Sequence, residues 1–121
     1  MDDAARRKLA SLLGLGVRGR MVVVGVEQVR VAATKNKLAY AIVAPDASPN
    51  SLEKVIPLLN ARRVRFSEAL GAAELGAAVG RQTTAVVGVV DGSLASGIRE
   101  LVEGAPAARD TRDGAPNGRK V

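Results

Sequence analysis

The segment Arg20-Met21-Val22-Val23-Val24-Gly25-Val26-Glu27-Gln28-Val29-Arg30 contains the most informative change of pattern in the chain. The β-branched run before Gly25 predicts a short strand, and the residues from 26 to 34 have the spacing of a helix. A glycine between a strand and a helix lets the chain turn at once, and its missing Cβ lets an anionic backbone come close. The N–H groups at the helix start are then free to face such a partner.

Strands and helices alternate from this segment to about residue 104. We predict strands over 20–24, 38–44, 64–66 and 85–90, and helices over 4–13, 26–34, 50–62, 72–79 and 93–102. Ser48 or Asn50 is expected to cap the third helix and Ser93 the last, while Pro57 is expected to kink the third. Because some strands are apolar on both sides, helices must cover both faces of the sheet. The sequence therefore predicts an α/β fold, a three-layer α/β/α sandwich.

The composition of the chain excludes several classes of protein and of functional site. The chain has 121 residues, of which 47% are hydrophobic, so we expect one packed domain over 1–104. It contains no cysteine, histidine or tryptophan, which excludes a disulfide scaffold, a Cys/His zinc site and a thiol or histidine catalyst. No apolar run is long enough to span a bilayer and residues 1–8 do not resemble a signal peptide, so we expect a cytoplasmic protein.

Residues 105–121 have almost nothing to bury and are expected to form a disordered basic tail.

Positive charge is concentrated at the start of the chain. The net charge is +6 overall, and residues 1–37 carry +5, residues 38–104 carry −1 and residues 105–121 carry +2. A small basic protein without recognisable catalytic groups favours a nucleic-acid partner. The alternative is a solvated basic surface with no partner.

Two motifs suggest chemistry but are interpreted structurally. Gly14-x-Gly16-x-x-Gly19 matches the dinucleotide-binding fingerprint, yet it follows a predicted helix instead of a strand, so we interpret it as a flexible helix-to-strand connection. Asp46 and Asp91 follow strands and could hold Mg²⁺, but no third ligand is near, and turn or helix-capping roles are favoured. We therefore predict no cofactor, no metal site, no small-molecule substrate and no enzymatic activity.

The helix predicted after Gly25 presents a polar face to solvent. Its spacing turns Val26, Val29 and Ala33 toward the core. On or beside the outer face lie Glu27, Gln28, Arg30, Val31, Thr34 and Lys35. An acid and an amide can read base edges, while neighbouring bases neutralise phosphates, namely Arg30, Lys35 and Lys37. The alternative is an intrahelical ion pair between Glu27 and Arg30, worth a few tenths of a kcal/mol, with Gln28 simply solvated.

Several stretches, taken together with their order and spacing, resemble the kink-turn RNA-binding family of ribosomal protein L7Ae, and especially its small bacterial members. The matching stretches are Leu12-Leu13-Gly14-Leu15, 20–25 with the helix behind it, Lys37-Leu38-Ala39, Ile42-Val43-Ala44-Pro45-Asp46-Ala47-Ser48-Pro49, Leu75-Gly76-Ala77-Ala78-Val79-Gly80, and 85–90. The resemblance covers roughly residues 9–103.

This resemblance implies a four-stranded mixed sheet between helical layers and an RNA-binding domain over 1–104. In the family, the glycine-led helix start enters the widened major groove of a kink-turn. There an Asn-Glu pair and a following lysine contact tandem sheared G·A pairs, and a loop before the last strand covers an extruded nucleotide. The partner would be structured RNA bound by a monomer, with ribosomal RNA or the ribosome as candidates and no membrane involved.

Carried over position by position, Gly25 matches the glycine, and Glu27 and Gln28 fall where Asn-Glu would be, in swapped order. The lysine falls on Val31, and Arg30 is the nearest base. The RNA-binding residues implied in this way are Arg20, Gly25, Glu27, Gln28, Arg30, Lys35, Lys37, Arg81, Gln82, Thr83 and Thr84. Two other functions stay open, a protein-interaction module on the same fold and a small enzyme or nucleotide binder.

Overall fold

The computed structural model describes residues 1–104, and the predicted tail over 105–121 lies outside them. The elements in chain order are α1 (Asp3–Arg18), β1 (Val22–Val24), α2 (Val26–Thr34), β2 (Tyr40–Val43), α3 (Pro49–Ala61), β3 (Phe66–Ser67), α4 (Ala72–Ala78), β4 (Val86–Val89) and α5 (Gly92–Glu103). Every predicted strand and helix is present. The strands are shorter than expected because their outer residues belong to the connections.

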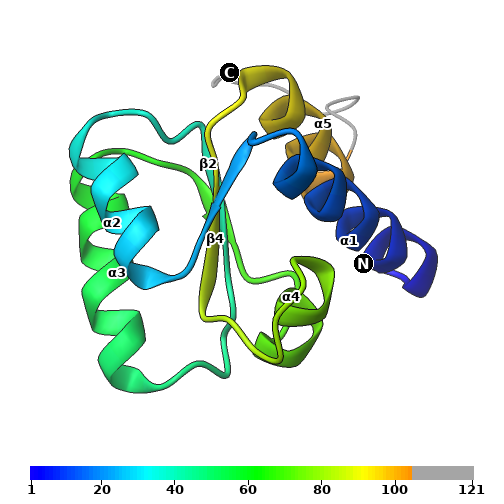
Figure 1. Ribbon diagram of the computed structural model, residues 1–121, viewed down its shortest axis with the longest axis horizontal. Helices are drawn as coiled ribbons and strands as arrows, with labels where there is room; N and C mark the ends of the chain where they lie inside the picture. Colours follow the sequence, from blue (N-terminus) through cyan, green and yellow to red (C-terminus); the bar gives the residue numbers. More distant parts are fainter. Residues whose placement is uncertain (105–121) are drawn as a thin grey trace.

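The four strands form one mixed sheet in the order β1-β4-β2-β3. β4 is antiparallel to both of its neighbours, and β3 is parallel to β2. As a result β1, β2 and β3 all end where β4 begins. We call this side of the sheet the carboxyl edge, and the opposite side, where these three strands begin, the amino edge. The carboxyl edge lies toward the bottom of Figure 1 and the amino edge toward the top.

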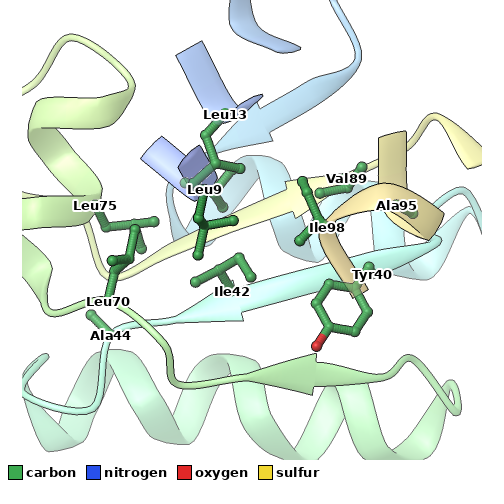
Figure 2. Close-up of a cluster of buried hydrophobic side chains, with 11 residues drawn as sticks. Leu9, Leu13, Tyr40, Ile42, Ala44, Leu70, Leu75, Val89, Ala95 and Ile98 are labelled. Carbon is green, nitrogen blue, oxygen red and sulfur yellow. The ribbon is translucent and has the colours of Figure 1, made fainter. Parts of the chain in front are cut away.

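Helices cover both faces of the sheet, as a three-layer sandwich requires (Figure 1). On one face α1, α4 and α5 pack over alternate strand residues such as Ile42 and Val87. Leu9 and Leu13 of α1 lie on this side, as Figure 2 shows. On the other face α2 and α3 pack over the intervening residues, among them Val43. The predicted α/β/α sandwich with a four-stranded mixed sheet is confirmed.

The glycines of the first helix do not end it. The prediction of a helix over 4–13 followed by a flexible connection is wrong, because α1 continues to Arg18. A Cβ at Gly16 would lie 2.8 Å from side-chain atoms of both Leu94 and Val22, and one at Gly14 would lie 3.2 Å from the Ala78 carbonyl oxygen. Small residues therefore let α1 pack closely against its neighbours, a gain that offsets the helix penalty of glycine.

Both aspartates that follow strands cap helices. Asp91 accepts a hydrogen bond from the Leu94 N–H (2.8 Å), so it caps α5 in place of the predicted Ser93. Asp46 accepts from the Ala72 N–H (2.8 Å) at the start of α4. Within residues 1–104 no cluster of three or more acidic, histidine or cysteine side chains is placed to hold a metal ion.

The third helix begins as predicted and passes its proline without interruption. Ser48 caps α3 by accepting from the Ser51 N–H at 3.1 Å. Pro57 lies inside α3 on an exposed position. There water can satisfy the carbonyl that the missing proline N–H leaves free, so the helix runs on to Ala61.

Three helices end in a left-handed residue that is not glycine. The φ angles are 59° at Arg20, 58° at Asn36 and 58° at Arg63. Each helix closes with the hydrogen bonds of a Schellman motif; after α3, for example, the Val64 N–H donates to the Leu59 carbonyl at 2.9 Å. Because each of these helices leads into one of the three strands β1, β2 and β3, all three residues lie at the amino edge.

The end of α5 is anchored to the edge of the sheet beside β3. The hydroxyl of buried Tyr40 donates to Glu103 (3.0 Å), and Arg65 forms an ion pair with the same carboxylate (3.0 Å). Burial is the main cause that raises the pKa of Tyr40 to about 12, and the Glu103 charge adds to it. Among the helices of residues 1–104, none is long and apolar enough to cross a membrane.

Candidate nucleic-acid interface

The junction between β1 and α2 is open to solvent. Gly25 has φ 93°, a backbone conformation that side chains rarely adopt, and a Cβ there would have no atom within 4 Å. No side chain caps the start of α2, so its first N–H groups have no side-chain acceptor. The junction is nevertheless fixed, because the Gly25 N–H donates to the Val86 carbonyl at 2.9 Å. It presents a rigid, positively polarised helix start.

The loop before β4 lies on α4. The Arg81 N–H donates to the Gly76 carbonyl (2.8 Å), and the Thr84 N–H donates to the Ala72 carbonyl (3.1 Å). Thr84 is buried, and its hydroxyl lies 3.5 Å from the Val86 carbonyl. The side chains of Arg81, Gln82 and Thr83 are exposed by contrast, so the loop has a fixed base and a free polar outer side.

The sheet brings this loop to the β1–α2 junction. Because β4 pairs with β1 on one side and β2 on the other, its first residues lie between Gly25 and Ala44. The Gly25 N–H bonds to Val86, and the Ala44 N–H bonds to the Ala85 carbonyl at 2.8 Å. The predicted residues of the helix start and of the loop therefore lie at the same carboxyl edge, on the two sides of the first residues of β4, although more than fifty residues separate them in sequence (Figure 1).

The outer face of α2 has the predicted composition. Glu27, Gln28, Arg30 and Val31 are all exposed, Val31 by 48%. Val29, Ala32 and Ala33 are buried, whereas Val26, which we expected inside, is only half-buried.

The alternative ion pair between Glu27 and Arg30 is not formed. The Arg30 guanidinium donates to the backbone carbonyl of Lys54 in α3. Within residues 1–104 the ion pairs join Arg6 to Glu74 and Arg65 to Glu103, so Glu27 keeps its full hydrogen-bonding capacity.

Three predicted site residues lie elsewhere. Helix α2 runs from the carboxyl edge back to the amino edge, so Lys35 and Lys37 follow its far end. Nine helical residues span about 14 Å. Arg20 precedes β1 and also lies at the amino edge. The structure thus divides the predicted set into a carboxyl-edge group and an amino-edge group joined by the length of α2.

Sequence reasoning missed how the loop is supported. Gly76 packs against the backbone of the loop at Thr83. Asp46, in the connection after β2, accepts a hydrogen bond from the start of α4. Arg6 also contacts α4 through Glu74, whose carboxylate accepts from the Gly71 N–H at 3.3 Å. These residues look like ordinary turn and helix residues in the sequence, and only the packing of α4 gives them a role at the site.

The sequence profile of the ribosomal protein L7Ae/L30e/S12e/Gadd45 family matches residues 7–98. The chain belongs to this family. Over 105 residues it is 32% identical to the RNA-binding protein YlxQ of Enterococcus faecium, and the match covers 86% of this chain and 100% of that relative.

Two solved structures share this fold of the L7Ae/L30e/S12e/Gadd45 family. One is a protein of unknown function from Bacillus halodurans C, with a TM-score of 0.73, 27% identity and coverage of 79% of this chain and 97% of that one. The other is the 15.5kD RNA binding protein of Giardia lamblia, with a TM-score of 0.66, 20% identity and coverage of 85% and 91%. The likeness to the Giardia protein concerns the fold.

Proposed function

We propose that this protein binds structured RNA at the carboxyl edge, without catalysing a reaction, and that a kink-turn is the element it recognises. The observation that carries this proposal is the Gly25–Val86 hydrogen bond, which fixes the glycine-led start of α2 to the beginning of β4, directly after the loop over 81–84. Membership of a ribosomal protein family and the name of the Enterococcus faecium relative support it. The RNA in the cell would be ribosomal RNA or another structured RNA, bound by a cytoplasmic monomer.

The chemistry of the two groups fits a folded RNA. The free N–H groups of α2 and the open space around Gly25 suit a phosphate backbone that comes close. Glu27 and Gln28 offer an acceptor and an amide to base edges, which is how sequence is read in a groove. The exposed outer side of the loop, with Arg81, Gln82 and Thr83, is placed to cover an unstacked nucleotide.

Val31 sets the expected strength of binding. It occupies the position at which the family resemblance implies a lysine, and a valine there can contact neither a guanine edge nor a phosphate. Loss of one good base contact costs about 1–3 kcal/mol, or ten- to a hundredfold in affinity. We therefore expect a weaker kink-turn binder whose phosphate contacts remain and whose affinity falls steeply with salt.

Titration with a kink-turn RNA and with a copy lacking the G·A pairs tests this proposal. We expect tighter binding of the intact kink-turn, and a preference that persists when salt is raised. Equal binding to both RNAs, lost in salt, would contradict kink-turn recognition and leave only generic electrostatic attraction.

The exposure of Val31 also favours a second function, a protein-interaction module on the same fold. Val31 is 48% exposed on the outer face of α2, where the family resemblance implies a lysine, and its apolar side chain can pack against a protein but cannot hydrogen-bond a phosphate. Pull-down from a nuclease-treated lysate separates the two functions. A partner that stays bound without RNA, and is lost in Val31→Asp, would favour the protein-interaction module.

A further inference from the structure

The layer formed by α2 and α3 has a cluster of basic side chains at the amino edge. Residues 28–45 and 54–67 together contain seven lysines and arginines and no aspartate or glutamate. Four of these bases lie around the ends of α2 and α3 and form what we call the amino-edge cluster: Lys35, Lys37, Arg62 and Arg63.

The two halves of the cluster are joined. Arg62 donates to the side-chain oxygen of Asn36 at 3.2 Å, which places the end of α3 beside the turn that holds both lysines. None of the four bases takes part in an ion pair within the part of the chain that the structure describes. Figure 1 shows the connections that follow α2 and α3 at the same end of the molecule. The four bases therefore form one exposed basic surface at this end of the α2–α3 layer.

The surface fits a polyanion better than a single small anion. All four bases are exposed, so each separate contact with an anion is weak and none forms an enclosed site. A nucleic-acid backbone gains from many such contacts at once, because each neutralised phosphate releases counterions. A shallow hollow of about 440 Å³, lined also by Phe66 and Glu103, opens beside Arg63 at the margin of the cluster.

We propose that the amino-edge cluster is a second RNA contact, which holds the phosphate backbone of a stem that continues from the element bound at the carboxyl edge. This inference rests on the proposed function and adds Arg62 and Arg63 to the footprint. The two contacts lie at opposite ends of α2, about 14 Å apart. One RNA can therefore reach both only if its stem extends beyond the kink-turn bound at the carboxyl edge. The contact carries no base specificity, because it reaches only phosphates.

The double variant Arg62→Ala/Arg63→Gly tests the proposal. Arg63 has φ 58°, a conformation that glycine adopts without strain, so we expect a melting temperature no lower than that of the natural protein. The control is Arg99→Ala, which removes an exposed arginine from α5 on the other face. Each protein is titrated at several salt concentrations with two kink-turn RNAs, one with a stem too short to reach the cluster and one with an extended stem.

We expect the double variant to bind the extended RNA roughly fivefold more weakly. The slope of log K against log salt concentration should become less negative by about one to two, because up to two phosphate contacts are lost. Its affinity for the short RNA and the binding by Arg99→Ala should be unchanged. Undiminished affinity for the extended RNA would overturn the proposal and leave the cluster to an acidic protein partner. An equal loss on both RNAs would also overturn it, since the contact would then not depend on the stem.

The proposed function fails by a different result. If the natural protein does not distinguish the kink-turn from a copy without G·A pairs, kink-turn recognition is wrong. A loss confined to the extended stem would still establish the amino-edge cluster as a phosphate contact.

Discussion

Gly76 of α4 lies directly beneath Thr83 of the loop before β4. A Cβ at position 76 would be 2.6 Å from the Thr83 Cα and 2.7 Å from its backbone nitrogen. Both neighbours are backbone atoms, so no rotation of a side chain can make room. The packing of α4 against the loop therefore fixes the position of the loop at the carboxyl edge.

Gly76→Ala should displace the loop. We expect the free energy of unfolding to fall by about 1–3 kcal/mol, as for other overpacked positions, and the affinity for a kink-turn RNA to fall because the loop is displaced from its place at the carboxyl edge. Denaturant unfolding and RNA titration measure the two effects. Gly97→Ala in α5 is the control, since a Cβ there meets no atom, and it should raise stability by about 0.5–1 kcal/mol without changing affinity. An unchanged affinity in Gly76→Ala would remove the loop from the interface.

Val31→Lys should strengthen RNA binding. The side chain is exposed on α2, so the substitution should change stability by less than about 0.5 kcal/mol. A new base contact would raise the affinity for a kink-turn about tenfold. Thr34→Lys adds the same charge one turn further along the exposed face. If both variants gained equally, the effect would be general electrostatics and position 31 would have no special place in the footprint.

Arg30→Ala should weaken RNA binding more than Arg99→Ala. Arg30 lies on α2, and its hydrogen bond to the Lys54 carbonyl holds its guanidinium over the α2–α3 layer. Arg99 lies on α5, which covers the other face of the sheet. Titration of both variants with the same RNA gives the comparison. Equal losses would move the binding surface away from α2.

Arg20→Gly should stabilise the protein. Arg20 follows α1 with φ 59°, and a non-glycine residue in this conformation costs about 1 kcal/mol. We expect the free energy of unfolding to rise by about that amount in denaturant titrations. Arg18→Gly, two residues earlier and still inside α1, should instead lower it by about 0.5–1 kcal/mol. The prediction fails if the two substitutions act in the same direction.

Tyr40 should ionise only at high pH. It is the one tyrosine of the chain, so phenolate absorbance reports this residue alone. Burial, aided by the charge of Glu103, raises its pKa to about 12 in the folded protein, against about 10 when unfolded. The folded state favours the neutral phenol, so the resulting stability, about 1–3 kcal/mol, is complete below pH 10 and is lost as the pH rises toward 12. A titration midpoint near 10 in the folded protein would contradict this, and Glu103→Gln should lower the midpoint in part.

The sequence indicated the layers of the fold but not the order of the strands. Apolar runs such as Val86–Val89 predicted strands buried on both faces, and the helix periodicity of 26–34 gave α2 its observed bounds. The length of α1 was missed because glycine disfavours a helix locally, and only its contacts with Leu94 and Val22 offset that cost. Asp91 and Ser93 are both good capping residues, so the local pattern could not decide between them.

The candidate site was predictable in part for the same reason. Gly25 and the exposed residues after it follow from one local segment, whereas their proximity to Thr83 depends on the antiparallel pairing of β4. Nearness in sequence groups the lysines at 35 and 37 with the residues that follow Gly25. In three dimensions α2 carries them to the opposite edge.

The attachment of Glu103 to Tyr40 and Arg65 has a practical consequence for spectroscopy. It holds the end of α5 beside the hollow next to Arg63, so a dye coupled at exposed Glu100, one turn before Glu103, would start a short distance from the bases that we propose touch RNA. The chain has no cysteine, and Glu100→Cys would therefore give one uniquely labelled position. Fluorescence from that position would follow the arrival of an extended stem without any change to the residues that hold it.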